Sequence, residues 1–81
     1  MNFEVIVQLK KEVLDPEGRA IQESLGRLGF RALTGAKVSK RYVLTIDEPA
    51  AKAAATIDQI AKEYLANPVS ETYEIREISK L

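Results

Sequence analysis

The side chains that most often carry out catalysis are missing from this sequence, which contains neither histidine nor cysteine. A hydrolase triad built on histidine and a metal site built on imidazole or thiolate are therefore excluded. Acid–base chemistry would depend on carboxylates, lysines or tyrosines, and no pair of these is marked by its spacing as more than a cap or a surface charge. The sequence thus predicts no catalytic residues, no bound cofactor and no metal ligands.

The stretch LDPEG, residues 14–18, is the first candidate for a phosphate or metal loop. Its two carboxylates would repel a phosphate, and it has neither the glycine pattern of a nucleotide loop nor the ligand array of an EF-hand. A helix start explains it better: Asp15 is a good N-cap, Pro16 suits the first helical position, and Glu17 is favoured by the helix dipole. Asp15, Pro16 and Gly18 are therefore predicted to shape a helix start.

Two other short stretches have polar side chains that suit a binding surface. KVSKRY, residues 37–42, carries Lys37, Lys40 and Arg41. Three such charges usually belong to a solvated turn, and the alternative is docking to an acidic surface or to a substrate phosphate. LANPV, residues 65–69, predicts a helix stop and a turn in which Asn67 satisfies local backbone groups.

The elements that must position these stretches follow from hydrophobic periodicity and from breaker residues. Residues 3–9 alternate between apolar and polar side chains, which predicts a strand with one buried face. An amphipathic helix follows at residues 16–28, with Gly29 as its left-handed stop. A second helix begins with Asp47 or Glu48 as its cap and Pro49 at its first position, and it ends near Asn67. Residues 70–78 predict the last strand.

The segment between the two helices allows two interpretations. Residues 30–47 can hold two strands with a tight turn near residues 39–41, or one long bent strand. The first gives a ferredoxin-like β-α-β-β-α-β two-layer α+β sandwich, with two helices on one face of a mostly antiparallel sheet. Each strand–helix–strand half would then be a right-handed crossover. The open sheet face would carry Ile6 and Val43, which are apolar enough to meet a partner.

Length and charge limit the classes of function. A chain of 81 residues predicts a single domain, residues 1–81, that buries only about 60% of its unfolded surface. Without disulfides, such a chain is expected to gain stability by self-association. Twelve basic and twelve acidic residues cancel, which argues against a nucleic-acid partner. The N-terminus lacks the pattern of a signal peptide and no stretch approaches a membrane span, so the expected location is the cytoplasm.

Three segments together resemble one family. They are LKKEVLDPEGRAIQESLGRLGF, KVSKRYVLTID and YLANPVSETYEI, in the order seen in PurS, the small S subunits of phosphoribosylformylglycinamidine synthase. The resemblance covers nearly the whole chain. It implies a non-catalytic subunit of de novo purine biosynthesis. In that family a glutaminase subunit releases ammonia, and a large synthetase subunit uses it with ATP and magnesium to form the amidine.

The same resemblance implies a scaffold. The S subunit associates with itself, as a dimer or a tetramer, and bridges the glutaminase and synthetase so that ammonia passes between their active sites. The family pattern is matched at four positions that we expect to contribute to partner surfaces: Lys40, Tyr42, Asn67 and Pro68. Ser39 stands where family members commonly have glycine, so a turn requiring positive φ there would be strained.

Two other classes of function stay open from the residues alone. One is a regulatory domain of ferredoxin-like shape that binds a small metabolite between protomers. The other is a stand-alone enzyme that uses carboxylates and lysines. Saturable binding of an amino acid or nucleotide to the isolated chain would favour the first, and turnover by the purified chain alone would favour the second.

Overall fold

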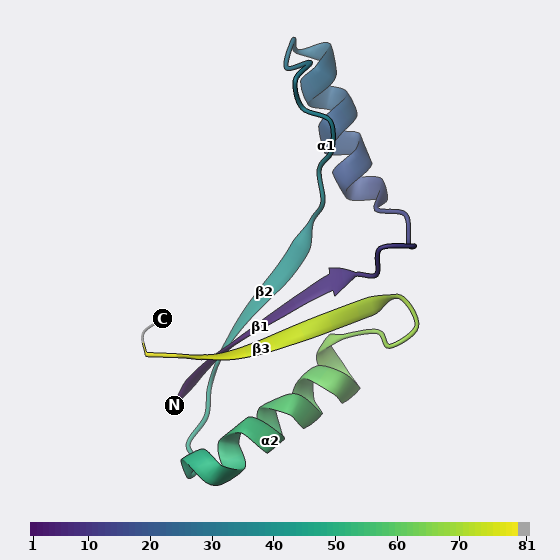
Figure 1. Ribbon diagram of the computed structural model, residues 1–81. Coiled ribbons are helices and arrows are strands. Elements are labelled where there is room, and N and C mark those ends of the chain that lie inside the picture. Colours follow the sequence, from purple (N-terminus) through teal and green to yellow (C-terminus); the bar gives the residue numbers. More distant parts are fainter. Residues whose placement is uncertain (80–81) are drawn as a thin grey trace.

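The computed structural model describes residues 1–79 as a three-stranded sheet with two helices (Figure 1). The strand order is β2-β1-β3, and both pairs of neighbouring strands are antiparallel. The predicted α+β class and antiparallel sheet are thereby confirmed. The elements in chain order are β1 (Asn2–Leu9), α1 (Pro16–Arg27), β2 (Ser39–Thr45), α2 (Ala50–Ile60), the π-helical turn η1 (Ala61–Leu65) and β3 (Glu71–Ile78).

The core lies between the sheet and α2. The alternation of β1 places Phe3, Val5 and Val7 on one face, where all three are buried. From α2 and η1, Ala53, Ile57 and Ala61 are buried against them at the spacing of four that one helix face requires. Partly buried side chains of the two edge strands complete this layer: Tyr42, Leu44, Tyr73 and Ile75.

The middle of the chain holds one strand, which decides between the two interpretations. Residues 39–41, where a tight turn was one prediction, lie inside β2 and pair with β1. The described residues therefore form three strands rather than the four of the ferredoxin-like prediction. Ser39 causes no strain, because no described residue other than glycine has positive φ.

Helix α1 differs from the prediction in its position. It projects beyond the end of the sheet, and residues 28–38 return beside it to β2 (Figure 1). Since β1 and β2 are antiparallel neighbours, their connection has only to go out and come back, and no crossover is needed. Only α2, which joins the two edge strands, crosses the sheet. The prediction of two helices on one face is thus corrected to one, and we call residues 16–38 the arm.

The helix boundaries follow from local chemistry. Gly29, just after α1, has φ of 104°, the left-handed conformation predicted for the residue that ends this helix. Pro49 was predicted as the first residue of the second helix. It is instead the N-cap of α2, which begins at Ala50, and it makes no side-chain cap bond. The π-helical turn closes with a 2.9 Å bond from the Ala66 N–H to the Ala61 carbonyl. Within residues 1–79, neither helix combines the length and apolar character that crossing a membrane requires.

The arm makes the molecule elongated. The radius of gyration is 16.2 Å, and the extents are 51 × 29 × 14 Å. A compact domain of this length would have a radius of gyration of about 12 Å. No residue of α1 belongs to the core formed by the described residues. The apolar stripe of α1 is consequently not covered by the sheet, and Leu28, directly after the helix, is 74% exposed.

Candidate functional site

Asp15 joins the base of the arm to the sheet. Its Oδ1 accepts a 2.9 Å bond from the Gly18 N–H, which caps α1, and its Oδ2 accepts a 2.9 Å bond from the Val38 N–H, just before β2. These backbone bonds, with that from Gly18 the stronger influence, hold the pKa of Asp15 below its usual value. The predicted helix-start residue thus also fixes a segment 23 positions away.

Gly18 lies where the returning segment passes closest to α1. A Cβ atom built on Gly18 would come within 3.0 Å of the Ala36 carbonyl oxygen, which belongs to the backbone. Gly18 is buried, and Pro16, two residues earlier, is the first residue of the helix. The helix start, the close approach and the two bonds of Asp15 therefore meet at one junction between the arm and the sheet.

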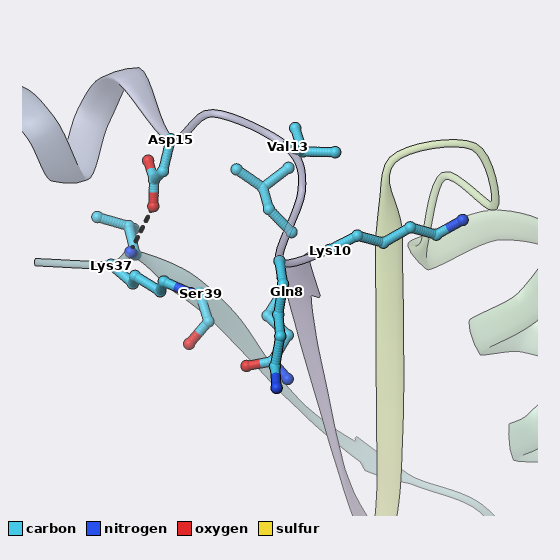
Figure 2. A pocket seen from close by; sticks show the side chains of 9 residues that line it. Gln8, Lys10, Val13, Asp15, Lys37 and Ser39 are labelled. Atoms are coloured by element: carbon cyan, nitrogen blue, oxygen red, sulfur yellow. Dashed lines mark hydrogen bonds between the residues drawn. The ribbon is translucent and has the colours of Figure 1, made fainter.

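A cavity of about 260 Å³ opens beside this junction (Figure 2). It lies where β1 ends and β2 begins, beyond the last strand pair, Gln8 with Ser39. The ammonium group of Lys37 lies near Ser39, and the Gln8 side chain faces them from β1 (Figure 2). The complete lining consists of Gln8, Leu9, Lys10, Lys11, Val13, Asp15, Lys37, Val38 and Ser39.

Lys40 and Tyr42, two of the predicted partner residues, lie on β2. In the strand register they are opposite Val7 and Val5, so they belong to the face that α2 covers. Tyr42 is partly buried and packs against the core, whereas Lys40 is exposed and lines a second cavity, of about 340 Å³, at the same end of the sheet. Lys40 is therefore the better placed of the two to contact another protein.

Asn67 and Pro68 form the turn between η1 and β3. The Asn67 Oδ1 accepts a 3.0 Å bond from the Val69 N–H. The backbone carbonyl of Asn67 accepts bonds from the N–H groups of Ser70 and Glu71. Both residues are exposed, and Pro68 lines a shallow hollow next to β3. Asn67 thus organises its own turn, while Lys40 lies on the opposite edge strand, so the structure brings these residues to one end of the sheet but not to one cluster.

The structure has a buried ion cluster on the open sheet face that the sequence analysis did not predict. Glu4 is only 4% exposed and accepts hydrogen bonds from two arginines on the flanking strands. The Arg76 Nη2 donates to Oε2 at 2.6 Å, and the Arg41 Nε donates to Oε1. Strand parity alone places Glu4 on this face, but only the register shows that Arg76 is its direct partner and that Val43 lies opposite on β2.

The Glu4 cluster predicts acid sensitivity. Bonds from Arg41 and then Arg76 lower the pKa of Glu4 in the folded chain. Its contribution to stability is therefore complete above the pKa of the unfolded chain, near 4.5, and is lost as the pH falls through the lower, folded value. We expect Glu4→Gln to flatten the fall of unfolding free energy below pH 5, measured by urea denaturation at several pH values. Glu23→Gln, in an exposed pair with Arg19, is the matched control; an acid limb equally steep in the wild type and Glu4→Gln would contradict the assignment.

An apolar hollow on the arm also escaped the sequence analysis. It measures about 470 Å³ and is lined by Leu25, Phe30, Ala32 and Leu33. Phe30 is 61% exposed although its ring is large and apolar. Exposed apolar surface of this kind marks an interaction site more often than a solvated face. The signal in the sequence was the amphipathic stripe of α1, which indicates an apolar face without showing what covers it.

Comparisons with known proteins connect this geometry to one family. The model of the PurS family, described as phosphoribosylformylglycinamidine (FGAM) synthase, matches residues 2–79. The PurS subunit of FGAM synthase from Methanocaldococcus jannaschii is 40% identical over 73 residues, which cover 89% of this chain and 88% of that protein. The PurS subunit from Mycobacterium leprae is also 40% identical, over 76 residues that cover 88% and 87% of the two chains.

Solved structures give the same likeness. The crystal structure of M. jannaschii PurS, described as one of the subunits of formylglycinamide ribonucleotide amidotransferase in the purine biosynthetic pathway, has a TM-score of 0.84 at 39% identity. That match covers 93% of this chain and 92% of the other. A chain in the structure of PurLQS from Thermotoga maritima has a TM-score of 0.70 at 30% identity and covers 95% of both.

Proposed function

Because the chain belongs to the PurS family of FGAM synthase subunits, we propose that it acts as a non-catalytic assembly subunit that bridges the glutaminase and the ATP-dependent synthetase. The chain is a subunit of FGAM synthase, an enzyme of purine biosynthesis. The observation that carries the bridging role is its likeness, over 95% of its length, to a chain in the PurLQS structure.

In this role the chain holds the two enzymes in place and takes no part in the chemical steps. The glutaminase releases ammonia, and the synthetase uses it with ATP and magnesium to convert formylglycinamide ribonucleotide into the amidine. Ammonia in water at neutral pH is protonated and diffuses away, so a seal that excludes water between the two active sites prevents its loss. A rigid spacer also makes the transfer effectively intramolecular. The expected location is the cytoplasm.

Self-association is part of the proposal, because the apolar surface of the arm is exposed in a single copy of the chain. The hollow of Leu25, Phe30 and Leu33 and the exposed Leu28 form an apolar surface outside the core. The molecule is also more extended than a compact monomer of its length. A second copy of the chain, in a dimer or a tetramer, would bury this surface and supply stability that so small a core lacks.

We assign partner contacts first to Lys40. It is exposed at the end of the sheet, next to the junction of Asp15 and Gly18, and no described carboxylate forms an ion pair with it. A cation in such a position suits an acidic group on a partner and contributes to the rate and specificity of docking. The exposed turn of Asn67 and Pro68 is the second surface.

Lys40→Glu tests this assignment. We expect it to weaken assembly with the glutaminase and synthetase about tenfold, because it places a like charge against an acidic partner surface. The measurement is size-exclusion chromatography with light scattering, on the chain alone and with both enzymes. Lys52→Glu, an equal charge change in the first turn of α2, should assemble as the wild type does.

An amidination assay with glutamine tests the role itself. Adding the chain to the two enzymes should restore glutamine-dependent synthesis, while activity with free ammonia should not require it. Full glutamine-dependent output without the chain, or product formation by the chain alone, would refute the assembly role. Equal assembly by Lys40→Glu and Lys52→Glu would refute only the Lys40 contact.

A further inference from the structure

The cavity at the junction of arm and sheet has a charge that the assembly role does not explain. Lys10, Lys11 and Lys37 line it, and Asp15 is its single carboxylate. Both oxygens of Asp15 already accept backbone N–H bonds, and the nearby charge of Lys37 also lowers the pKa of this carboxylate, so Asp15 offsets part of the lysine charge. The ion pairs found among residues 1–79 involve none of the three lysines. In a chain with no net charge, the cavity is therefore lined by more lysines than carboxylates, although the Lys10 ammonium group extends away from Lys37 and Ser39 toward β3 (Figure 2).

The neighbouring cavity shows that this charge is particular to one place. It shares several residues with the first, but it is lined by one lysine, Lys40, and by three carboxylates, Asp15, Glu17 and Glu71. Only the first cavity thus has an excess of cations. An anion reaching this end of the sheet would be attracted to the lysine-lined cavity and repelled from its neighbour.

The remaining lining supplies hydrogen-bond donors on one side and an apolar wall on the other. Ser39 lies near the Lys37 ammonium group, and the Gln8 side chain lies across from them on the β1 side (Figure 2). Leu9, Val13 and Val38 contribute apolar surface. A few convergent polar groups set in apolar surroundings are the usual composition of a small-ligand site.

We propose that this cavity binds a small phosphorylated molecule, whose phosphate contacts Lys37, Lys11 and Ser39 and whose carbon skeleton lies against the apolar wall. The size limits the ligand: about 260 Å³ lies just below the usual range for drug-sized ligands, so the cavity fits a sugar phosphate better than a dinucleotide. The ligand would rest where β2 meets the arm, at the bond between Asp15 and Val38. This proposal does not depend on the assembly role and is tested without the other subunits.

The test is a titration of the full-length chain, in its own association state, with ribose 5-phosphate, inorganic phosphate and ribose. Backbone amide shifts in ¹H–¹⁵N spectra are followed at low salt. We expect ribose 5-phosphate to shift the amides of Gln8, Lys11 and Ser39 saturably and ribose to shift none of them. Lys37→Gln should weaken binding about tenfold or more, since a hydrogen bond to a charged group is lost. Lys52→Gln, remote on α2, should bind as the wild type does.

The outcomes separate the sources of the phosphate. Tighter binding of ribose 5-phosphate than of inorganic phosphate supports a sugar phosphate with the apolar wall in use. Equal binding supports a site for the phosphate group itself. Absence of saturable shifts, shifts spread equally to Lys52 and Lys62, or unchanged affinity in a folded Lys37→Gln variant would overturn the proposal. The exposed side chain of Lys37 makes misfolding of that variant unexpected, and its spectrum without ligand checks this.

Discussion

Replacing Ile57 by alanine should lower the free energy of unfolding by about 2–5 kcal/mol, which is a large part of the stability of so small a core. Ile57 is 1% exposed and is the largest side chain of α2 in the core. It packs in the layer that contains Val5 and Val7, which are the other large, fully buried side chains. The change removes apolar contacts and leaves a cavity that the strands of one small sheet cannot close fully.

Urea denaturation measures this loss as a lower midpoint with an unchanged slope. Protein concentration has to be held constant, because self-association contributes to the apparent stability. Gln59→Ala, two residues away on the exposed side of α2, is the matched control and should change stability by less than about 0.5 kcal/mol. Similar losses in both variants would contradict the assignment of the effect to the core, because alanine improves helix propensity at both positions.

Two glycines of α1 should respond in opposite directions to the same substitution. Gly18→Ala is expected to cost about 1–3 kcal/mol, because the added Cβ would collide with the backbone carbonyl of Ala36. Gly26→Ala meets no atom within 4 Å and should stabilise the helix by about 0.5–1 kcal/mol. Both glycines have ordinary negative φ, so the difference arises from space alone.

The glycine pair is measured by thermal and urea denaturation at one protein concentration. Loss of the Asp15–Val38 bond in Gly18→Ala should also appear as faster hydrogen exchange at the Val38 amide. If both variants are stabilised, the returning segment does not contact α1 at Gly18 in solution.

Much of the local structure was predictable because its causes are local. The alternation of β1 identified its buried face, and the Asp15-Pro16 pair identified the start of α1. Gly29 identified the end of that helix. Each of these signals depends on residues within one or two turns of the chain. The sequence therefore predicts such elements well, whatever the rest of the chain does.

The placement of α1 and the number of strands were not predictable in the same way. An amphipathic stripe shows that a helix has an apolar face, but it does not say whether the sheet of the same chain or another molecule covers it. The length of residues 30–47 allowed two strands, whereas the structure uses residues 28–38 to return beside α1. Register decides such questions, and register is a property of pairs of strands.

In the candidate site too, local features were predictable from the sequence and long-range contacts were not. Lys37 and Lys40 were recognised as part of a basic stretch, but their separation onto two cavities of opposite charge depends on strand pairing. Glu4 was read as one member of an alternating strand, and its two arginine partners lie 37 and 72 positions away. No local pattern connects residues so far apart in the chain.

The exposed apolar surface of the arm has a consequence for how much of this subunit a cell should synthesise. A copy synthesised in excess of its companions would keep Leu28 and Phe30 in water, where quality-control proteases and chaperones select such surfaces. Matched production of all the subunits, for instance from genes transcribed together, would avoid that waste. The exposed side chains of the arm thereby connect the structure of the subunit to the amount of it that a cell should produce.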